Sequence, residues 1–242
     1  GKSSLVNEIH KPIVGARGYF ISGKFDQLKR NIPYASLIQA FQELIRQLLT
    51  ESNEAIATWR AKLEAALGAN GQKIIGLQPA VPSLGATESQ NRFNRVFQQF
   101  IRVFTQPEHP LVIFLDDLQW VDLASLKLIQ LLVCNRNLQY LLLIGAYRDN
   151  EVNASHPLML TLEELQQTGA TVNRIILQPL QISHVEQLVS DTLHSDISKI
   201  TPLAELVFHK TEGNPFFLTQ LLKSLYQEKL LFFNFDRGCW QW

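Results

Sequence analysis

The spacing of apolar residues predicts alternating helices and strands over most of the chain. Apolar residues recur at helical spacing in five segments: 33–52, 56–67, 90–104, 123–133 and 157–167. Apolar runs of strand length occur at 18–26, 111–115, 138–149 and 171–180. An uninterrupted run such as LVIFL (111–115) is typical of a strand that is buried on both faces of a parallel sheet. The order predicts an α/β fold with a doubly wound parallel sheet.

The remaining segments complete the predicted organisation. A short helix is expected from Leu5 to His10, ended by Pro12, and the Gly- and Pro-rich stretch 68–86 is expected to be a long loop. After Pro179 the pattern becomes helical. Three helices are expected to begin at a capping box in 183–186, at Thr201-Pro202 and at Asn214-Pro215. A hairpin is expected around 236–238. We therefore expect an α/β core over 1–179, a helical lid lobe over 180–229, and over 230–242 the start of a hairpin or of a following domain.

Composition excludes several classes of protein. The 22 Lys and Arg residues balance the 22 Asp and Glu residues, so the chain has no basic excess of the kind that nucleic-acid and membrane-surface binders carry. The two cysteines, Cys134 and Cys239, form neither a disulfide framework nor a metal site. The apolar runs are far shorter than a membrane span. We expect a cytoplasmic domain whose partners include neither nucleic acid nor membrane.

The chain begins with GKSS, and this stretch has two interpretations. It matches the second half of G-x-x-x-x-G-K-[ST], a phosphate-binding loop in which the lysine reaches the β/γ oxygens and a hydroxyl holds Mg²⁺. It also fits an ordinary helix N-cap, with Ser3 or Ser4 capping the segment that follows. Under the first interpretation Gly1, Lys2, Ser3 and Ser4 are candidate nucleotide-binding residues.

Charged side chains follow two neighbouring apolar runs at the point where each predicted strand ends. Asp116 and Asp117 follow the first, and Arg148 follows the next. In open α/β sheets, ligands bind at the carboxyl ends of the strands, and adjacent carboxylates there are commonly offset by a divalent cation with its phosphates. Two structural alternatives stay open: the aspartates as a capping pair, and Arg148 as the partner of Asp149 or Glu151. Lys24 and Arg30 are expected on a solvated loop face, Gln119 is expected to bond backbone, and Trp120 is expected to pack the loop.

Several motifs together resemble one family. IFLDDLQWVD (113–122) resembles the Walker B region of the STAND branch of AAA+-related P-loop NTPases, LLLIGAYRDNEV (141–152) resembles its sensor segment, and EGNPFFLTQLL (212–222) resembles its Gly-x-Pro motif. GKFDQLKRNIPY (23–34) extends the likeness, which covers nearly the whole chain. Together these stretches are similar to the ATPase region of bacterial multi-sensor signalling proteins. In such proteins a Ser/Thr kinase domain precedes the ATPase, and GAF and histidine-kinase or cyclase modules follow it.

The resemblance implies ATP and Mg²⁺ as cofactors and a role for each motif residue. Lys2 contacts the β/γ phosphates, Ser3 ligates Mg²⁺, and Asp116 holds Mg²⁺ through water. Asp117 orients or deprotonates the attacking water, and Arg148 senses the γ-phosphate. Further along the chain, Asn214 and Pro215, with Gly213 nearby, are implied to line the adenine pocket.

The resemblance also implies the biological setting. The family's first, central strand and the opening half of its phosphate loop do not precede Gly1, so we expect the chain to be a fragment that binds nucleotide poorly by itself. In the intact protein we expect an ATP-binding, slowly hydrolysing regulatory module. Its expected partners are ATP or ADP, flanking kinase, GAF or other signalling domains of the same polypeptide, and copies of itself when ATP is bound. The alternatives are a nucleotide-binding scaffold without turnover and an origin-recognition-like DNA-associated ATPase. The whole protein could also be classified as a kinase, although nothing in this chain resembles a protein-kinase catalytic loop.

Overall fold

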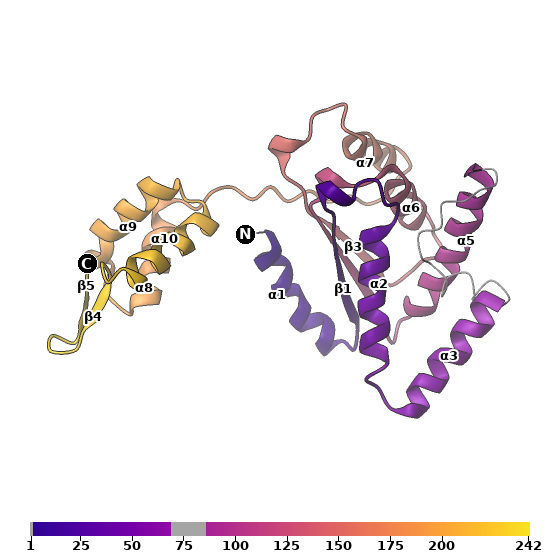
Figure 1. Cartoon of the computed structure of the whole chain (residues 1–242), viewed down its shortest axis with the longest axis horizontal. Coiled ribbons are helices and arrows are strands. Elements are labelled where there is room, and N and C mark those ends of the chain that lie inside the picture. Colours follow the sequence, from indigo (N-terminus) through magenta and orange to yellow (C-terminus); the bar gives the residue numbers. More distant parts are fainter. Residues whose placement is uncertain (1, 69–85) are drawn as a thin grey trace. The chain divides into compact units, whose positions relative to one another are not determined.

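A parallel three-stranded sheet forms the centre of the first compact unit, which spans Lys2–Asn173. The computed structural model describes residues 2–68 and 86–242. Its sheet has the order β1 (Tyr19–Lys24), β2 (Leu111–Asp116), β3 (Leu141–Gly145), and both pairs are parallel (Figure 1). Because both pairs are parallel, all three strands end on the same side of the sheet, which is called the sheet edge below. The predicted α/β class with a parallel sheet is confirmed.

Helices pack on both faces of this sheet. They are α1 (Lys2–Gly15), α2 (Ala35–Leu48), α3 (Asn53–Leu67), α5 (Ala86–Phe104), α6 (Leu123–Val133) and α7 (Pro157–Gln167). On one face Ile21 and Ile113 join a large buried cluster with residues of α2, α3, α5, α6 and α7. On the other face Phe20 and Phe114 pack with Val6 of α1. Figure 1 shows α1 and α2 on opposite sides of β1. The alternation along each strand therefore decides which helix each residue meets.

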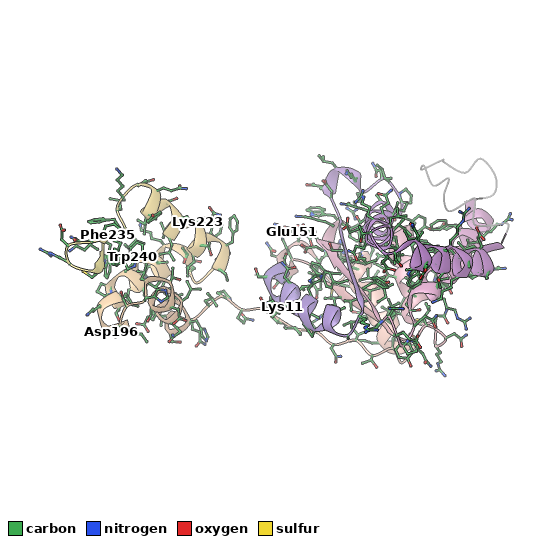
Figure 2. All side chains as sticks on the ribbon, turned by 90° about the horizontal axis from the view of Figure 1, so that it is seen from below. Lys11, Glu151, Asp196, Lys223, Phe235 and Trp240 are labelled. Atoms are coloured by element: carbon green, nitrogen blue, oxygen red, sulfur yellow. The ribbon has the colours of Figure 1, made fainter. Side chains whose placement is uncertain are left out.

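The second compact unit, Arg174–Trp242, is a helical lobe with its own core. It contains α8 (Ile182–Leu193), α9 (Ile197–Thr211), α10 (Pro215–Gln227) and a hairpin of β4 (Phe232–Asn234) and β5 (Cys239–Gln241). Val189, Leu203 and Leu218 are among its buried residues, and Trp240 of the hairpin packs against them. Figure 2 labels Trp240 and, at the turn, the exposed Phe235. The hairpin of β4 and β5 thus packs on the helices of this unit.

Three predicted helix boundaries are wrong. The first helix does not end before Pro12 but continues to Gly15, and α9 begins at Ile197 with Pro202 inside it. Helix α8 begins one residue before Ser183, and its capping box joins Gln181 to His184. At Pro202 the packing of the neighbouring turns overrides the local signal. Ile200 and Leu203, on either side of Pro202, are both fully buried, which keeps that turn helical.

Two predicted strands differ from the structure. The segment 171–180 has no regular structure, because strands require hydrogen bonds to a neighbouring strand and no described strand pairs with it. Its Ile175 and Ile176 are 76% and 67% exposed. The run 138–149 contributes only the five residues of β3, which is an edge strand of the described sheet. Leu142 is consequently half exposed rather than buried.

Other expectations on structure are confirmed. Asp122 caps α6 by accepting a hydrogen bond from the backbone N–H of Ser125 (2.8 Å), and the phenylalanines of α5 face the core. The expected loop 68–86 lies almost wholly outside the described residues. In the described part of the chain, no helix combines the length and apolar character needed to cross a membrane.

Candidate functional site

The start of the chain meets the carboxyl ends of two strands more than a hundred residues later. The hydroxyl of Ser3 donates to Oδ2 of Asp116 (3.2 Å), and Nζ of Lys2 donates to the carbonyl oxygen of Tyr147 (2.7 Å). Lys2 and Ser3 form the first turn of α1, Asp116 ends β2, and Tyr147 follows β3. The structure thus brings together the lysine, the hydroxyl and the first aspartate that the sequence singled out.

Packing explains why α1 reaches this edge. Val6 is buried against Phe114 and Ala146, so the first turns of α1 are held over the ends of β2 and β3. The N-terminal turn of a helix carries unpaired backbone N–H groups and a positive dipole end, which together favour an anion. Ser4 is exposed in the same turn, and Gly1 lies outside the described residues. The edge therefore combines a helix start, a lysine and a carboxylate.

Asp117 lies beside Asp116 but has a different set of partners. Its backbone is left-handed (φ 53°), which interrupts the strand and separates the two side chains. Its Oδ1 accepts a hydrogen bond from the amide of Gln119 (3.1 Å) and lies 3.9 Å from Nε of Arg148. Its Oδ2 lies 3.3 Å from Nζ of Lys24, at the end of β1. A residue of its own turn and two distant chain segments therefore converge on this one carboxylate.

Arg148 bridges two carboxylates. Besides its approach to Asp117, its Nη1 forms an ion pair with Oε1 of Glu151 (2.9 Å), in the short 3₁₀ helix Asp149–Glu151. The sequence left Asp149 and Glu151 open as structural partners of Arg148, and the structure pairs the arginine with Glu151. The other oxygen of Glu151, Oε2, is buried without a hydrogen-bond partner in the described residues. Arg148 itself remains largely exposed at the sheet edge, where an incoming anion could compete for it.

The donor atoms at this edge fit Mg²⁺ with a bound polyphosphate. Mg²⁺ prefers oxygen ligands and is commonly held by one or two side chains together with substrate phosphates. The Ser3 hydroxyl and the Asp116 carboxylate already lie at hydrogen-bond distance, so one ion could bind both. Within the described residues, no group of three or more His, Cys, Asp or Glu side chains could hold a metal alone. The arrangement suits a cation that arrives with a phosphate ligand.

Asn214 and Pro215 belong to the helical unit, where their structural roles are clear. Gly213 has a left-handed backbone (φ 70°) after α9, and its carbonyl oxygen accepts the N–H of Leu180 (2.8 Å). Asn214 caps α10 through a hydrogen bond from the N–H of Phe216 (3.0 Å), and Pro215 occupies the first turn. The Gly-Asn-Pro motif therefore builds a tight corner between two helices, whatever else it contacts.

Two residues have larger roles at the site than the sequence indicated. Lys24 was expected on a solvated face; it is exposed, but it also pairs with Asp117. Gln119 was expected to bond backbone, and its Oε1 does accept the N–H of Arg148 (3.2 Å). Its Nε2 additionally holds Asp117. The sequence signal for both is their place at strand ends, but only the register of the sheet shows which carboxylate each one meets.

The loop that follows β1 is held by a half-buried phenol, that of Tyr34. The hydroxyl of Tyr34 donates to Oδ1 of Asn94 (3.2 Å) and accepts from the amide of Gln90 (3.2 Å). Burial raises the pKa of Tyr34; the hydrogen bond from Gln90 opposes this rise, and the charge of Asp122 adds to it. The phenol therefore stays protonated at neutral pH and keeps the loop after Lys24 tied to α5.

Comparison with known proteins agrees with this geometry. The family model described as "AAA ATPase domain" matches residues 1–144, a range that includes Lys2, Ser3, Asp116 and Asp117. Hybrid signal transduction histidine kinase G of Dictyostelium discoideum is 29% identical over an alignment that covers 99% of this chain and 9% of that protein. Peroxide stress-activated histidine kinase mak3 of Schizosaccharomyces pombe is 23% identical over 52% of this chain and 5% of that protein. No solved structure matches.

The matches show the family of the chain and the kind of protein in which similar sequences occur. The chain spans less than a tenth of the length of these curated relatives, and both of them are histidine kinases. Its parallel sheet with flanking helices is consistent with a P-loop NTPase-like AAA fold, and a domain of this kind implies ATP binding. The family model covers well over half of the sequence, and on that basis the chain belongs to the AAA ATPase domain family.

Proposed function

We propose that this chain is the ATP-binding and slowly ATP-hydrolysing regulatory module of a larger multidomain signalling protein. The single observation that carries the proposal is the hydrogen bond between Ser3 and Asp116, with Lys2 beside it at the same sheet edge. Similarity to two histidine kinases supports the signalling context. Flanking kinase or GAF domains and ATP-dependent self-association are part of the proposal.

Binding of the phosphates is assigned to the first turn of α1. Lys2 has its ammonium group at the ends of β2 and β3, where it would exchange the Tyr147 carbonyl for β- and γ-phosphate oxygens. Ser3 and Asp116 would hold Mg²⁺, which when bound neutralises phosphate charge. Asn214 and Pro215 are proposed to contact the adenine, in keeping with their exposed corner at the start of α10.

The chemical step is assigned to Asp117 and Arg148. A carboxylate that orients a water molecule and accepts its proton supplies the base that hydrolysis needs. Asp117 suits this role because its side chain is only 16% exposed and its orientation is fixed by several partners. Arg148 would transfer its guanidinium from Glu151 and Asp117 to the γ-phosphate, stabilising negative charge there.

One observation also favours a second candidate function, a nucleotide-binding scaffold without turnover. Asp117 is already paired with Lys24 and lies near Arg148, so both of its oxygens face protein side chains rather than a position for an attacking water. In that case nucleotide would still bind through Lys2, Ser3 and Asp116. The two functions differ in whether phosphate is released.

Replacing Asp117 by asparagine in the full-length protein tests the proposal. The variant keeps the size and shape of the side chain, but it replaces one acceptor oxygen by an amide donor and removes the charge and basicity. We expect phosphate release to fall about 100-fold or more, with ATP affinity changed only slightly, because general-base catalysis contributes on this scale. Phosphate release and the binding of a fluorescent ATP analogue are measured on the same preparation.

Asp196→Asn is the matched control. Asp196, labelled in Figure 2, precedes α9 in the helical unit and pairs with Lys199 (3.7 Å), so it also loses one lysine partner. This control should release phosphate at the wild-type rate. Equal phosphate release by wild type and Asp117→Asn would contradict the hydrolytic proposal and favour the scaffold.

A further inference from the structure

A short 3₁₀ helix places a carboxylate beside the arginine that is proposed to contact the γ-phosphate. Glu151, labelled in Figure 2, follows Arg148 closely in the chain, and its Oε1 lies 2.9 Å from Nη1 of that arginine. The guanidinium therefore already has an anionic partner within the protein. Neither the family model's description nor the names of the relatives assign Glu151 a role.

The backbone around this ion pair is held in place. The N–H of Arg148 donates to Oε1 of the buried Gln119 (3.2 Å), and the N–H of Glu151 donates to the carbonyl oxygen of Arg148 (3.1 Å). The next residue, Val152, packs against the large buried cluster. Because the backbone is anchored at these points, a change of partner for Arg148 requires movement of its side chain alone.

The two charged side chains differ in their contact with solvent. The side chain of Arg148 is 57% exposed, whereas that of Glu151 is 23% exposed. The second oxygen of Glu151, Oε2, is buried and has no hydrogen-bond partner in the described residues. Arg148 can therefore turn toward a phosphate at the sheet edge, but the carboxylate that it leaves stays mostly buried. Release of the arginine is costly, because a partly buried charge loses its partner.

That cost applies to one kind of nucleotide. ATP carries the γ-phosphate to which Arg148 is assigned, so binding of ATP has to compete with Glu151 for the guanidinium. ADP has no γ-phosphate and therefore does not require the arginine to leave Glu151. A ligand shifts such an equilibrium only by its different interactions with the two states. A carboxylate at this position therefore weakens the binding of ATP selectively.

We infer that Glu151 is a specificity-determining residue, which holds Arg148 away from the γ-phosphate position and so lowers the preference of the site for ATP over ADP. The inference rests on the proposed function, in particular on the contact of Arg148 with the γ-phosphate, and adds the residue that opposes this contact. In a regulatory module the competition raises the ratio of ATP to ADP at which the ATP-bound form becomes dominant. Glu151 is not assigned a contact with the nucleotide.

Replacing Glu151 by glutamine in the full-length protein tests the inference. The amide keeps the shape of the side chain but removes the charge that binds Arg148. The affinity for the β,γ-imido analogue of ATP with Mg²⁺ should rise about fivefold, the scale of a partly exposed ion pair, while the affinity for ADP should change by about twofold or less. Isothermal titration measures both affinities. Retained binding of ADP also shows that the variant is folded.

Asp149→Asn is the matched control. Asp149 is exposed in the same 3₁₀ helix, and among the described residues it forms no ion pair with Arg148. The substitution removes an equal charge from the same turn and should leave both affinities unchanged. If Asp149→Asn tightens ATP binding as much as Glu151→Gln does, the charge of the turn in general is responsible and the inference is overturned. An equal rise in the affinities for ATP and ADP in Glu151→Gln would overturn it too.

A double-mutant cycle tests whether Glu151 acts through the arginine. When Arg148 is already methionine, Glu151→Gln should have no further effect on the affinity for the ATP analogue, because the shared partner is gone. An equal rise in both backgrounds would contradict the inference. A fall in affinity in Glu151→Gln would contradict it as well, since Glu151 would then orient Arg148 toward the phosphate.

The variant Arg148→Met alone separates failure of the inference from failure of the proposed function. We expect it to weaken binding of the ATP analogue while the affinity for ADP is retained. If it does so but Glu151→Gln leaves the affinity for the analogue unchanged, only the inference fails. If Arg148→Met changes the affinity for neither nucleotide, the proposed contact of Arg148 with the γ-phosphate fails, and the role of Glu151 fails with it.

Discussion

Two adjacent aspartates, Asp116 and Asp117, have different contacts because the backbone turns between them. Asp116 continues the strand and accepts hydrogen bonds from Ser3 and from the N–H of Asp117. Asp117 takes a left-handed conformation (φ 53°) and joins Lys24 and Gln119 instead. Non-glycine residues rarely adopt this conformation unless their surroundings hold them there. The contacts of Asp117 supply that constraint.

Gln119 is the buried link in this arrangement, and its loss should be costly. The side chain is 1% exposed and joins Oδ1 of Asp117 to the N–H of Arg148. Gln119→Leu keeps similar volume but leaves both partners without their hydrogen bond. We expect the free energy of unfolding to fall by about 1–3 kcal/mol, the cost of leaving buried polar groups unsatisfied. Urea denaturation with linear extrapolation measures it.

Gln187→Leu provides the control for this prediction. Gln187 is exposed on α8 and donates to Asp191 (2.7 Å). Exposed substitutions of this kind change stability by about 0.5 kcal/mol or less. Equal effects of the two substitutions would show that the Gln119 contacts contribute little to stability.

The sequence predicted much of the site but not its connections. The motif at Lys2 and Ser3 and the carboxylates at the strand end were enough to predict that Ser3 and Asp116 would lie together. Lys24 could not be assigned in the same way. Its contact depends on the register between β1 and β2, which aligns Lys24 with Asp116, and register is a property of the folded sheet.

At the scale of elements, periodicity predicted which helices and strands exist better than where they end. The stripe of buried phenylalanines in α5 and the apolar run of β2 were both recognisable because each has one clear period. The sequence predicts a helix end at Pro12 and a helix start at Pro202, yet both prolines lie inside helices. A proline signal gives the cost of continuing a helix, and at Pro202 burial of Ile200 and Leu203 offsets that cost.

The corner between α9 and α10 depends on the absence of a side chain at Gly213. Gly213 and Gly238 both have left-handed backbones (φ 70° and 59°), so alanine is strained at each. At Gly213 a Cβ would also collide with the carbonyl group of Leu180, whereas at Gly238 it would meet nothing within 4 Å. We expect Gly213→Ala to destabilise the helical unit by about 1–3 kcal/mol more than Gly238→Ala, the usual cost of overpacking.

Hydrogen exchange measures this difference. The amides of α9 and α10 should lose protection in Gly213→Ala, and the free energy of local opening gives the size of the effect. Subtracting the value for Gly238→Ala removes the shared cost of the left-handed backbone. Equal values for the two variants would mean that the contact with Leu180 relaxes without cost.

At the scale of the whole molecule, the chain forms two compact units, each with its own buried cluster. The parallel sheet lies in the first unit, whereas the regular elements of the second are helices and one hairpin. The segment 171–180, near the boundary, was predicted as a strand but has no regular structure. An apolar pattern indicates that a segment favours burial. It does not indicate whether a neighbouring strand is available to form the hydrogen bonds of a sheet. The apolar pattern was therefore insufficient to predict the structure of 171–180.

Separate cores predict separate responses to a cavity. Leu203 of α9 and Leu132 of α6 are each 1% exposed and belong to different clusters. Replacing either by alanine should cost about 2–5 kcal/mol, because the removed atoms leave a cavity. Even 2 kcal/mol raises the population of the open form by roughly 30-fold. Proteolysis rates follow that population when opening and closing are fast compared with cleavage.

Limited proteolysis read by mass spectrometry therefore distinguishes the two units. Leu203→Ala should speed cleavage within α8, α9 and α10 by about 30-fold or more while sites in α2, α5 and α6 keep the wild-type rate. Leu132→Ala should give the opposite pattern, because its cavity removes contacts from the cluster around the parallel sheet. If either substitution speeds cleavage in both units equally, the two clusters unfold as one cooperative structure. That outcome would contradict the prediction that the two units have independent stabilities.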